Sequence, residues 1–403
     1  MIIDRSEVWV TGVGIISSLG TGFKENIYNI KSGQSPLKIL QGLNSIHDGK
    51  YIVGQIPLTD LELIQKHHLD YDENLNRTSI MASIAFEECL TSANAKSFVS
   101  SITIACATTV GGMSSTESKF DEIIRKEYTP DAVFIDEMDC GNMGRMLQNQ
   151  YDTGGENFTI STACSSASNS IVLGGRLIRS GKSKMVIAGG SDSLSKFVLN
   201  GFLSLKNVDK EACRPFDASR SGLNLGEGAA FLLLEESEHA RSRNAKPLAI
   251  LKGYCNVNET YHMTGSSPDG DGALLAMKGA VENSGLTPED IDFVHAHGTS
   301  TIDNDLAESV ALNKLFGREI SFASSKCYTG HTLAASGAIS SVLSIGMLDE
   351  DFIYPALNFN EPIPESGLTP NINFMSDTGL KNVMINSFGF GGNNTSLIFS
   401  KAE

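Results

Sequence analysis

The sequence predicts an α/β fold, because two kinds of segment alternate along the chain. Short runs of apolar and β-branched residues have the length of buried strands; they cover residues 8–13, 102–106, 185–188, 230–234, 293–296 and 383–386. Longer segments have apolar residues at helical spacing; they cover residues 79–90, 165–178, 273–281 and 332–348. Strands that alternate with helices are typical of layered α/β proteins.

Two similar stretches are consistent with a duplicated fold. ISTACSSASNSIVLGG, at residues 160–175, and ASSKCYTGHTLAASGAISSV, at residues 323–342, both read as a strand, a turn of small residues and a small-residue helix. Such units also recur in α/β proteins without duplication, so both interpretations stay open on this pattern. The polar segment at residues 236–246 is the best boundary, and it divides the chain into residues 1–240 and 241–403.

Composition narrows the classes of function. The chain has 403 residues, 41% of them hydrophobic, and a net charge of −16, which argues against a nucleic-acid partner. The first residues, MIIDRSEVWV, lack the pattern of a signal peptide, and no apolar run is long enough to cross a membrane. We therefore expect a cytoplasmic protein without membrane contact. Seven scattered cysteines form no CxxC pair, so we expect neither a disulfide framework nor a metal site.

Cys164 is the candidate nucleophile. It stands in TACSS, between a strand at residues 158–160 and a helix. The unpaired N–H groups of a helix N-terminus favour a thiolate, so we expect a pKa below the usual ~8.5. The same small residues also suit a tight helix crossing without any chemistry.

Two histidines are candidate partners. His297 follows an apolar strand in HAHGTST, where Thr299 and Thr301 can receive a polar, extended ligand. His331 follows a glycine turn near a helix N-terminus, which favours the neutral imidazole that hydrogen-bond donation to developing negative charge requires. Lys326 stands between small residues, where burial is plausible. Strand and helix capping would explain an isolated HGT motif equally well.

A glycine-rich stretch, NSFGFGGNN at residues 386–394, surrounds Phe388 and Phe390. Its spacing fits neither GxGxxG nor a P-loop. We interpret it as a mobile aromatic gate with an exposed backbone N–H. His295, two residues before His297, is assigned to packing.

Together these motifs, in this order and spacing, resemble the elongating β-ketoacyl-[acyl-carrier-protein] synthases of the thiolase superfamily. The stretches VWVTGVGIISSLG, CRPFDASRSGLNLGEGAA and ETYHMTGSSPDGDG match as well, so the resemblance covers nearly the whole chain. It implies a thiolase-like, duplicated, five-layer αβαβα fold. It also implies a dimer, and substrates carried on the phosphopantetheine arm of acyl carrier protein without a further cofactor.

The resemblance implies a decarboxylating Claisen condensation. Cys164 would take the acyl group, and His297 and His331 would stabilise the enolate formed when malonyl-acyl carrier protein loses carbon dioxide. The backbone N–H groups of Cys164 and Phe390 would hold the second oxyanion. Lys326 would orient His331.

The remaining implied roles concern support and substrate binding. Glu308 would support Lys326, and Phe390 would gate the acyl pocket. The residues that would contact the substrate are Thr299, Thr301, Phe388, Gly389 and Gly391.

Three departures from the family pattern leave the pathway open. Ser340 stands where many members have a glutamate, nine residues after the second histidine. RSGLN replaces the usual RDGFV at residues 220–224, and GGNN replaces GGTN at residues 391–394. Fatty-acid synthesis and a specialised polyene or polyketide pathway both fit, as do a homodimer and a heterodimer with a related synthase or chain-length factor.

Three alternatives compete with the synthase. They are a catalytically silent chain-length partner, a thiolase or Cys-His-Asn synthase that uses coenzyme A thioesters, and a cysteine hydrolase. Because acyl carrier protein is acidic, basic residues should ring the mouth of the tunnel; the candidates are Lys66, Arg77, Lys119, Arg125, Lys126 and Lys206.

Overall fold

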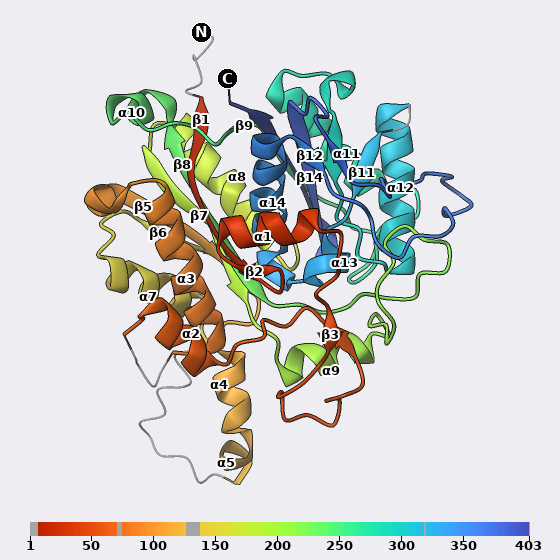
Figure 1. Cartoon of the computed structure of the whole chain (residues 1–403), viewed down its shortest axis with the longest axis horizontal. Coiled ribbons are helices and arrows are strands. Elements are labelled where there is room, and N and C mark those ends of the chain that lie inside the picture. Colours follow the sequence, from red (N-terminus) through yellow and green to blue (C-terminus); the bar gives the residue numbers. More distant parts are fainter. Residues whose placement is uncertain (1–6, 71–74, 126–137, 318–319, 403) are drawn as a thin grey trace.

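The computed structural model describes residues 7–70, 75–125, 138–317 and 320–402. Two sets of five strands form its framework (Figure 1). The strands of the first half lie in the order β6-β5-β7-β8-β1; they are β1 (Val8–Ser17), β5 (Ile102–Ala107), β6 (Asn157–Ile160), β7 (Met185–Asp192) and β8 (Gly228–Glu236). β5 is parallel to both β6 and β7, whereas β8 is antiparallel to both β7 and β1.

The second half repeats this topology. Its strands lie in the order β11-β10-β14-β15-β9; they are β9 (Ala249–Asn258), β10 (Phe293–His295), β11 (Ser321–Ala323), β14 (Asn382–Gly389) and β15 (Asn393–Lys401). Numbered within each half, both orders read 3-2-4-5-1, and the parallel and antiparallel pairs correspond one to one. The predicted duplication is therefore confirmed.

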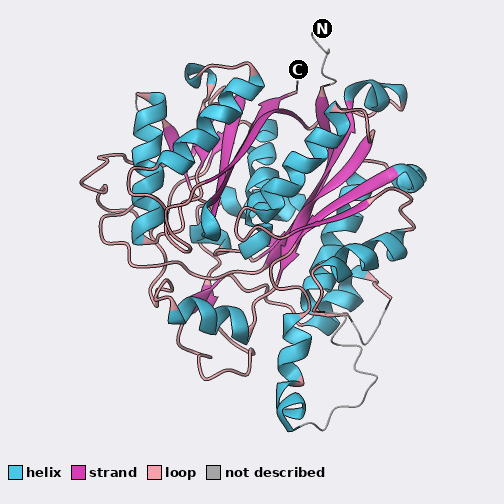
Figure 2. Cartoon of the chain, turned by 180° about the vertical axis from the view of Figure 1, so that it is seen from behind, coloured by secondary structure: helices cyan, strands magenta, loops and turns pink. Residues whose placement is uncertain are grey.

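Helices complete five layers (Figures 1 and 2). α8 (Ser166–Arg179) and α14 (Ser336–Glu350) lie between the two sets of strands and contact both. α3 (Arg77–Ser92) and α7 (Gly141–Tyr151) cover the outside of the first set. α11 (Asp271–Ser284) and α12 (Ile302–Phe316) lie outside the second. The thiolase-like αβαβα prediction is confirmed.

Glycines explain how α8 fits between two sheets. A Cβ at Gly174 would lie 2.8 Å from Leu234 Cδ1 of β8, and one at Gly175 would lie 2.9 Å from Tyr254 Cε1 of β9. Adjacent glycines thus face opposite halves, and a larger residue at either position would push a strand away. α14 is buried from residue 336 through residue 348, where all of its residues are apolar or small.

The predicted strands and helices all form, although β9 and β15 were not predicted. β9 carries Lys252 and Gly253 within its run, and β15 opens with four polar residues, so neither has a strand-like apolar pattern. The proposed division between residues 240 and 241 falls within the short α10 (Ser237–Ser242) that connects the halves, and it stays a proposal.

The smaller elements lie between or beside the layers. They are β2 (Gly20–Thr21), α1 (Phe23–Lys31), β3 (Lys38–Ile39), β4 (Ile52–Val53), α2 (Asp60–His67), η1 (Lys96–Ser101), α4 (Met113–Ser118), α5 (Phe120–Arg125), α9 (Lys196–Ser204), η2 (Pro288–Asp290), α13 (Lys326–Thr329), η3 (Leu333–Ala335), β12 (Phe352–Ile353), β13 (Met375–Ser376) and η4 (Phe390–Gly392). Among the described residues, no helix is long and apolar enough to cross a membrane.

Candidate active site

Cys164 lies in a strained turn between β6 and α8. Ala163 has φ +52°, a left-handed conformation that is uncommon for a residue with a side chain. The turn is held by its own polar groups: Thr162 N donates to Ser166 Oγ at 2.8 Å, and Ser166 N donates to Ala163 O at 3.2 Å. This turn presents the thiol at the start of α8, where it is 6% exposed.

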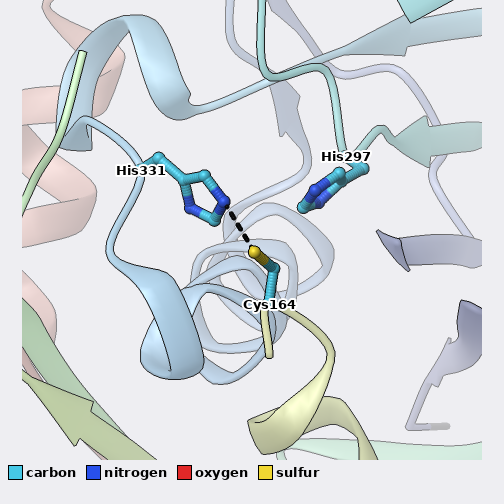
Figure 3. A group of neighbouring side chains, drawn as sticks. All are labelled: Cys164, His297 and His331. Carbon is cyan, nitrogen blue, oxygen red and sulfur yellow. Dashed lines mark hydrogen bonds between the residues drawn. The ribbon is translucent and has the colours of Figure 1, made fainter. Parts of the chain in front are cut away.

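Both predicted histidines reach this thiol (Figure 3). His331 Nε2 lies 3.1 Å from Cys164 Sγ. The rings of His297 and His331 are 5.5 Å apart between centroids and nearly perpendicular. One nitrogen of each ring and the sulfur all lie within 4.8 Å of one another, and all three side chains are buried. The loops after β6, β10 and β11 therefore converge at one point.

Lys326 contacts His297, so the prediction that it orients His331 was wrong. Its ammonium lies 3.4 Å from His297 Nδ1 and donates a short hydrogen bond to His297 O. α13 begins at Lys326 and places the side chain beside the end of the neighbouring strand β10. Because an ammonium only donates, Nδ1 accepts, and His297 carries its hydrogen on Nε2.

Glu308, on α12, holds the backbone beside His297. Its carboxylate accepts hydrogen bonds from His297 N and Gly298 N, both at 2.8 Å, and from Asn386 Nδ2 at 3.0 Å. Burial raises the pKa of Glu308, and burial lowers the pKa of Lys326 while the charge of Glu308 opposes that shift. Each of these two buried groups thus stabilises the charged form of the other.

Burial also decides the protonation of the triad. It lowers the pKa of His297 and of His331 well below the ordinary value, and the charge of Lys326 lowers both further. Both imidazoles are therefore neutral near pH 7. Burial raises the pKa of Cys164 to about 11, although Lys326 and the backbone N–H of Phe390 oppose this. The expected lowering by the helix N-terminus is overturned, because desolvation of the thiolate outweighs it.

Two backbone N–H groups lie at the sulfur, those of Cys164 and Phe390. They are the two donors predicted for an oxyanion hole. The Phe390 ring stacks on Phe202 of α9, with centroids 5.7 Å apart. Phe202 in turn meets His331 edge-on at 6.5 Å, and Phe388 meets His297 at 5.9 Å. An aromatic group thus closes the space around the thiol.

A cavity leads from the surface to Cys164 and the aromatic rings around it. Its lining contains eight of the predicted site residues, namely Cys164, His297, Thr299, Thr301, His331, Phe388, Gly389 and Phe390. Thr299 Oγ1 and Thr301 Oγ1 are 2.8 Å apart. Gly391 is outside the lining and exposed; its N–H donates to Met263 O at 2.7 Å.

Of the predicted basic residues, Lys206 is exposed and lines the mouth of this cavity. The prediction that Arg77 lies at the mouth was wrong, because its guanidinium is mostly buried in ion pairs with Glu227 and Asp60. Lys126 lies outside the described residues. Lys66, Lys119 and Arg125 are exposed away from the lining.

Sequence reasoning missed several residues that support the site. Asp192, at the end of β7, is fully buried and accepts hydrogen bonds from Thr108 Oγ1, Thr109 Oγ1 and Ala334 N at 2.6, 2.6 and 2.8 Å. It therefore fixes the turn that follows His331. The acidic residue directly after an apolar strand was a visible signal, whereas nothing in the local sequence singled out Phe202.

The triad also has the composition of a metal site, because a cysteine and two histidines can bind zinc. The buried ammonium of Lys326 beside His297 would repel a cation at this place, and a thiol with a raised pKa is a poor ligand. Ser340 is buried in α14 and provides no carboxylate here.

A duplicated αβαβα fold with a cysteine and two neutral histidines at its centre defines a thiolase-like condensing enzyme. Residues 5–240 match the N-terminal domain of β-ketoacyl synthases, and residues 248–360 match the C-terminal domain. The chain belongs to the β-ketoacyl synthase family, as its motifs predicted.

Relatives match over their full length. The chain is 30% identical to 3-oxoacyl-[acyl-carrier-protein] synthase 2 of Coxiella burnetii, over 99% of both chains. It is 31% identical to the enzyme of the same name from Vibrio cholerae, over 99% of this chain and 100% of that one.

Solved structures of ketosynthases are also similar to this chain over its whole length. The ishigamide ketosynthase/chain length factor superposes with a TM-score of 0.92 at 26% identity, covering 99% of this chain and 100% of that one. A β-ketoacyl synthase from Burkholderia phymatum gives a TM-score of 0.89 at 29% identity with the same coverage.

Proposed function

We propose that this chain catalyses the decarboxylating condensation of an acyl chain on Cys164 with malonyl-acyl carrier protein. One observation carries the proposal: a buried thiol lies within reach of two neutral imidazoles and two backbone N–H donors. A condensing enzyme must stabilise an enolate and a tetrahedral oxyanion in turn, and this arrangement supplies a pair of donors for each.

Acyl transfer comes first. Cys164 Sγ attacks the carbonyl carbon of the acyl thioester, the carbon–sulfur bond to the pantetheine arm breaks, and the thiol proton ends on the pantetheine sulfur. His331 Nε2, 3.1 Å from Sγ, relays this proton. Its Nδ1 has no hydrogen-bond partner among the described residues, so neither neutral tautomer is locked and Nε2 can accept and then donate.

Decarboxylation and condensation follow. The malonyl thioester loses carbon dioxide, and the electron pair of the broken bond becomes an enolate held by Nε2–H of His297 and of His331. The enolate carbon attacks the acyl carbonyl on Cys164, and the N–H groups of Cys164 and Phe390 hold the resulting oxyanion. Collapse of that oxyanion releases the Cys164 thiolate and the β-ketoacyl product. Thr299 and Thr301 bind the pantetheine arm, and Phe388 and Gly389 shape the entrance, whereas Gly391 lies outside the lining.

The relatives support acyl carrier protein as the substrate carrier. The curated relatives are named for synthesis on this carrier, and a similar type II polyketide ketosynthase was solved in complex with its acyl-carrier protein, at a TM-score of 0.89 and 26% identity. The reaction needs no cofactor beyond the carrier's arm. We propose a dimer, as a homodimer or with a chain-length factor like that of the ishigamide system. A cytoplasmic location is also proposed, and the seven unpaired cysteines support it.

The alternatives fit less well. A silent partner would not need Cys164 beside His331. A hydrolase uses a carboxylate to orient its histidine, yet the partner of His297 Nδ1 is Lys326, and His331 Nδ1 has no partner in the described chain.

The experiment is incubation with an acyl carrier protein that bears a short acyl chain and with malonyl-acyl carrier protein, followed by mass spectrometry. We expect an acyl adduct on the peptide with Cys164 and a product two carbons longer. An adduct on another cysteine, or free acid as the sole product, would contradict the proposal. Cys140→Ser and Cys255→Ser variants serve as controls, because both thiols are only partly buried.

A further inference from the structure

A polar network ties the glycine-rich gate to the turn of the nucleophile, and Asn393 stands at its centre. The Oδ1 atom of Asn393 accepts three hydrogen bonds, from Ser165 Oγ and Asn169 Nδ2 at 2.7 Å each and from Asn256 Nδ2 at 2.8 Å. Ser165 directly follows Cys164, and Asn169 lies one turn further along α8. One side-chain oxygen thus joins the start of α8, in the first half, to β9 and β15, in the second.

The network continues on both sides of Asn393. Asn169 Nδ2 also donates to Thr162 Oγ1 at 2.8 Å, on the turn before Cys164. Thr395 Oγ1 donates to Asn169 Oδ1 at 2.8 Å and is also 2.8 Å from Asn256 Nδ2. Ser165 Oγ is also 2.7 Å from Thr162 O, so its single hydrogen is shared between this carbonyl and Asn393 Oδ1. The backbone that carries the thiol is therefore fixed against β15 by several hydrogen bonds.

Asn393 lies only three residues after Phe390, so the network also restrains the position of the Phe390 backbone. Phe390 N–H and Cys164 N–H are the two donors at the sulfur, and they belong to different halves of the fold. Covalent structure does not fix the distance between them. The Asn393 hydrogen bonds do, because they connect the residue next to Cys164 with the first residue of β15.

We infer that Asn393 is a positioning residue that sets the geometry of the oxyanion hole formed by Cys164 N–H and Phe390 N–H. It acts through Ser165 and Asn169 and touches no substrate. GGNN stands here where the resemblance leads one to expect GGTN, so the carboxamide is a feature of this chain. The inference rests on the proposed function, and it names the residue on which one of the two anion sites depends.

The two anion sites respond differently to a change at this position. The enolate of decarboxylation is held by His297 and His331, which Asn393 does not contact. The oxyanions of acyl transfer and condensation are held by the backbone pair. A donor displaced by about 1 Å can cost on the order of 10²-fold in rate. A defect confined to acyl transfer and condensation thus distinguishes positioning from a general loss of structure.

The test compares three variants in two assays. Asn393→Ala removes the acceptor. Asn393→Asp keeps an acceptor oxygen at the same distance, and all three contacts are donors to that oxygen. Asn258→Ala is the matched control, because Asn258 is exposed on the adjacent strand β9 and its side chain donates to Glu259 O. The assays are single-turnover acylation of Cys164 and release of carbon dioxide from malonyl-acyl carrier protein.

For Asn393→Ala we expect single-turnover acylation to fall by about 10- to 10²-fold, with carbon dioxide release within about twofold of the wild type. Asn393→Asp should restore most of the acylation rate, and Asn258→Ala should change neither assay. Equal losses in both assays, or an unchanged acylation rate in Asn393→Ala, would overturn the inference. A wild-type protein that neither acylates Cys164 nor releases carbon dioxide would instead refute the proposed function.

Discussion

The two halves of the molecule have the same strand order but supply different chemical groups to one site. After the third strand, the first half provides Cys164, and the second provides Lys326 and His331. After the second strand, the first half provides Thr108 and Thr109, which donate to Asp192, and the second provides His297.

The fourth strand of the first half, β7, ends in Asp192. The fourth strand of the second half, β14, leads into the gate around Phe390. The first half therefore supplies the nucleophile, and the second supplies the enolate donors and the gate. Duplication created two facing sets of loops, and the reaction requires that they differ.

The largest expected effect comes from removing a donor in the second half. His297→Ala should lower carbon dioxide release from malonyl-acyl carrier protein by about 10²–10³-fold, because one of two neutral donors to the enolate is lost. Single-turnover acylation of Cys164 should stay within a few-fold of wild type. His68→Asn, at an exposed histidine that ends α2, is the control. If acylation fell by the same factor as carbon dioxide release, the two halves would not have the separate roles described above.

The first half can be tested by pH. Because burial raises the pKa of Cys164 to about 11, the thiolate fraction grows about tenfold per pH unit below that value. Alkylation of Cys164 by iodoacetamide, followed by peptide mass spectrometry, should therefore accelerate about 10²-fold between pH 7 and pH 9. A rate that is already constant near pH 7 would show that the helix N-terminus dominates after all.

Lys326 tests the link within the second half. Lys326→Met removes the donor to His297 Nδ1 and should lower carbon dioxide release by about 10- to 10²-fold, since the imidazole is then free to adopt the wrong tautomer. Because Lys326 acts through His297, the effect should disappear in a His297→Ala background and persist in a His331→Ala background. The reverse pattern would restore the sequence-based assignment to His331.

The smallest effect concerns the mouth of the cavity. Lys206→Glu should raise KM for carrier-bound substrate about 3- to 10-fold, and added salt should weaken the difference, because an exposed charge acts mainly on encounter with an acidic partner. KM for a small thioester without a carrier should not change. Lys246→Glu, an exposed lysine between α10 and β9, is the control. Equal effects of both variants would mean that only net charge matters.

Much of this comparison could be predicted from the sequence. The strand-forming runs are local and predicted the α/β class. The motifs around Cys164, His297 and His331 are local as well, and their resemblance to the β-ketoacyl synthases implied the αβαβα fold and the triad. The sequence did not reveal that Lys326 contacts His297, because this contact depends on which strand lies beside β11 in the folded sheet.

Two other features were also hidden from the sequence. The raised pKa of Cys164 depends on how completely other elements bury the turn, which no local pattern reveals. Asn393 was visible as a departure, yet its contact with Ser165 joins residues 228 positions apart.

The central claim is that the nucleophile and the enolate donors are separate, and Cys164→Ala tests it most directly. The variant keeps His297 and His331 and removes only the thiol. We predict that carbon dioxide release from malonyl-acyl carrier protein continues at or above the wild-type rate, while no β-ketoacyl product is detected by mass spectrometry. Continued condensation by the variant, or loss of carbon dioxide release together with condensation in a folded variant, would contradict the account.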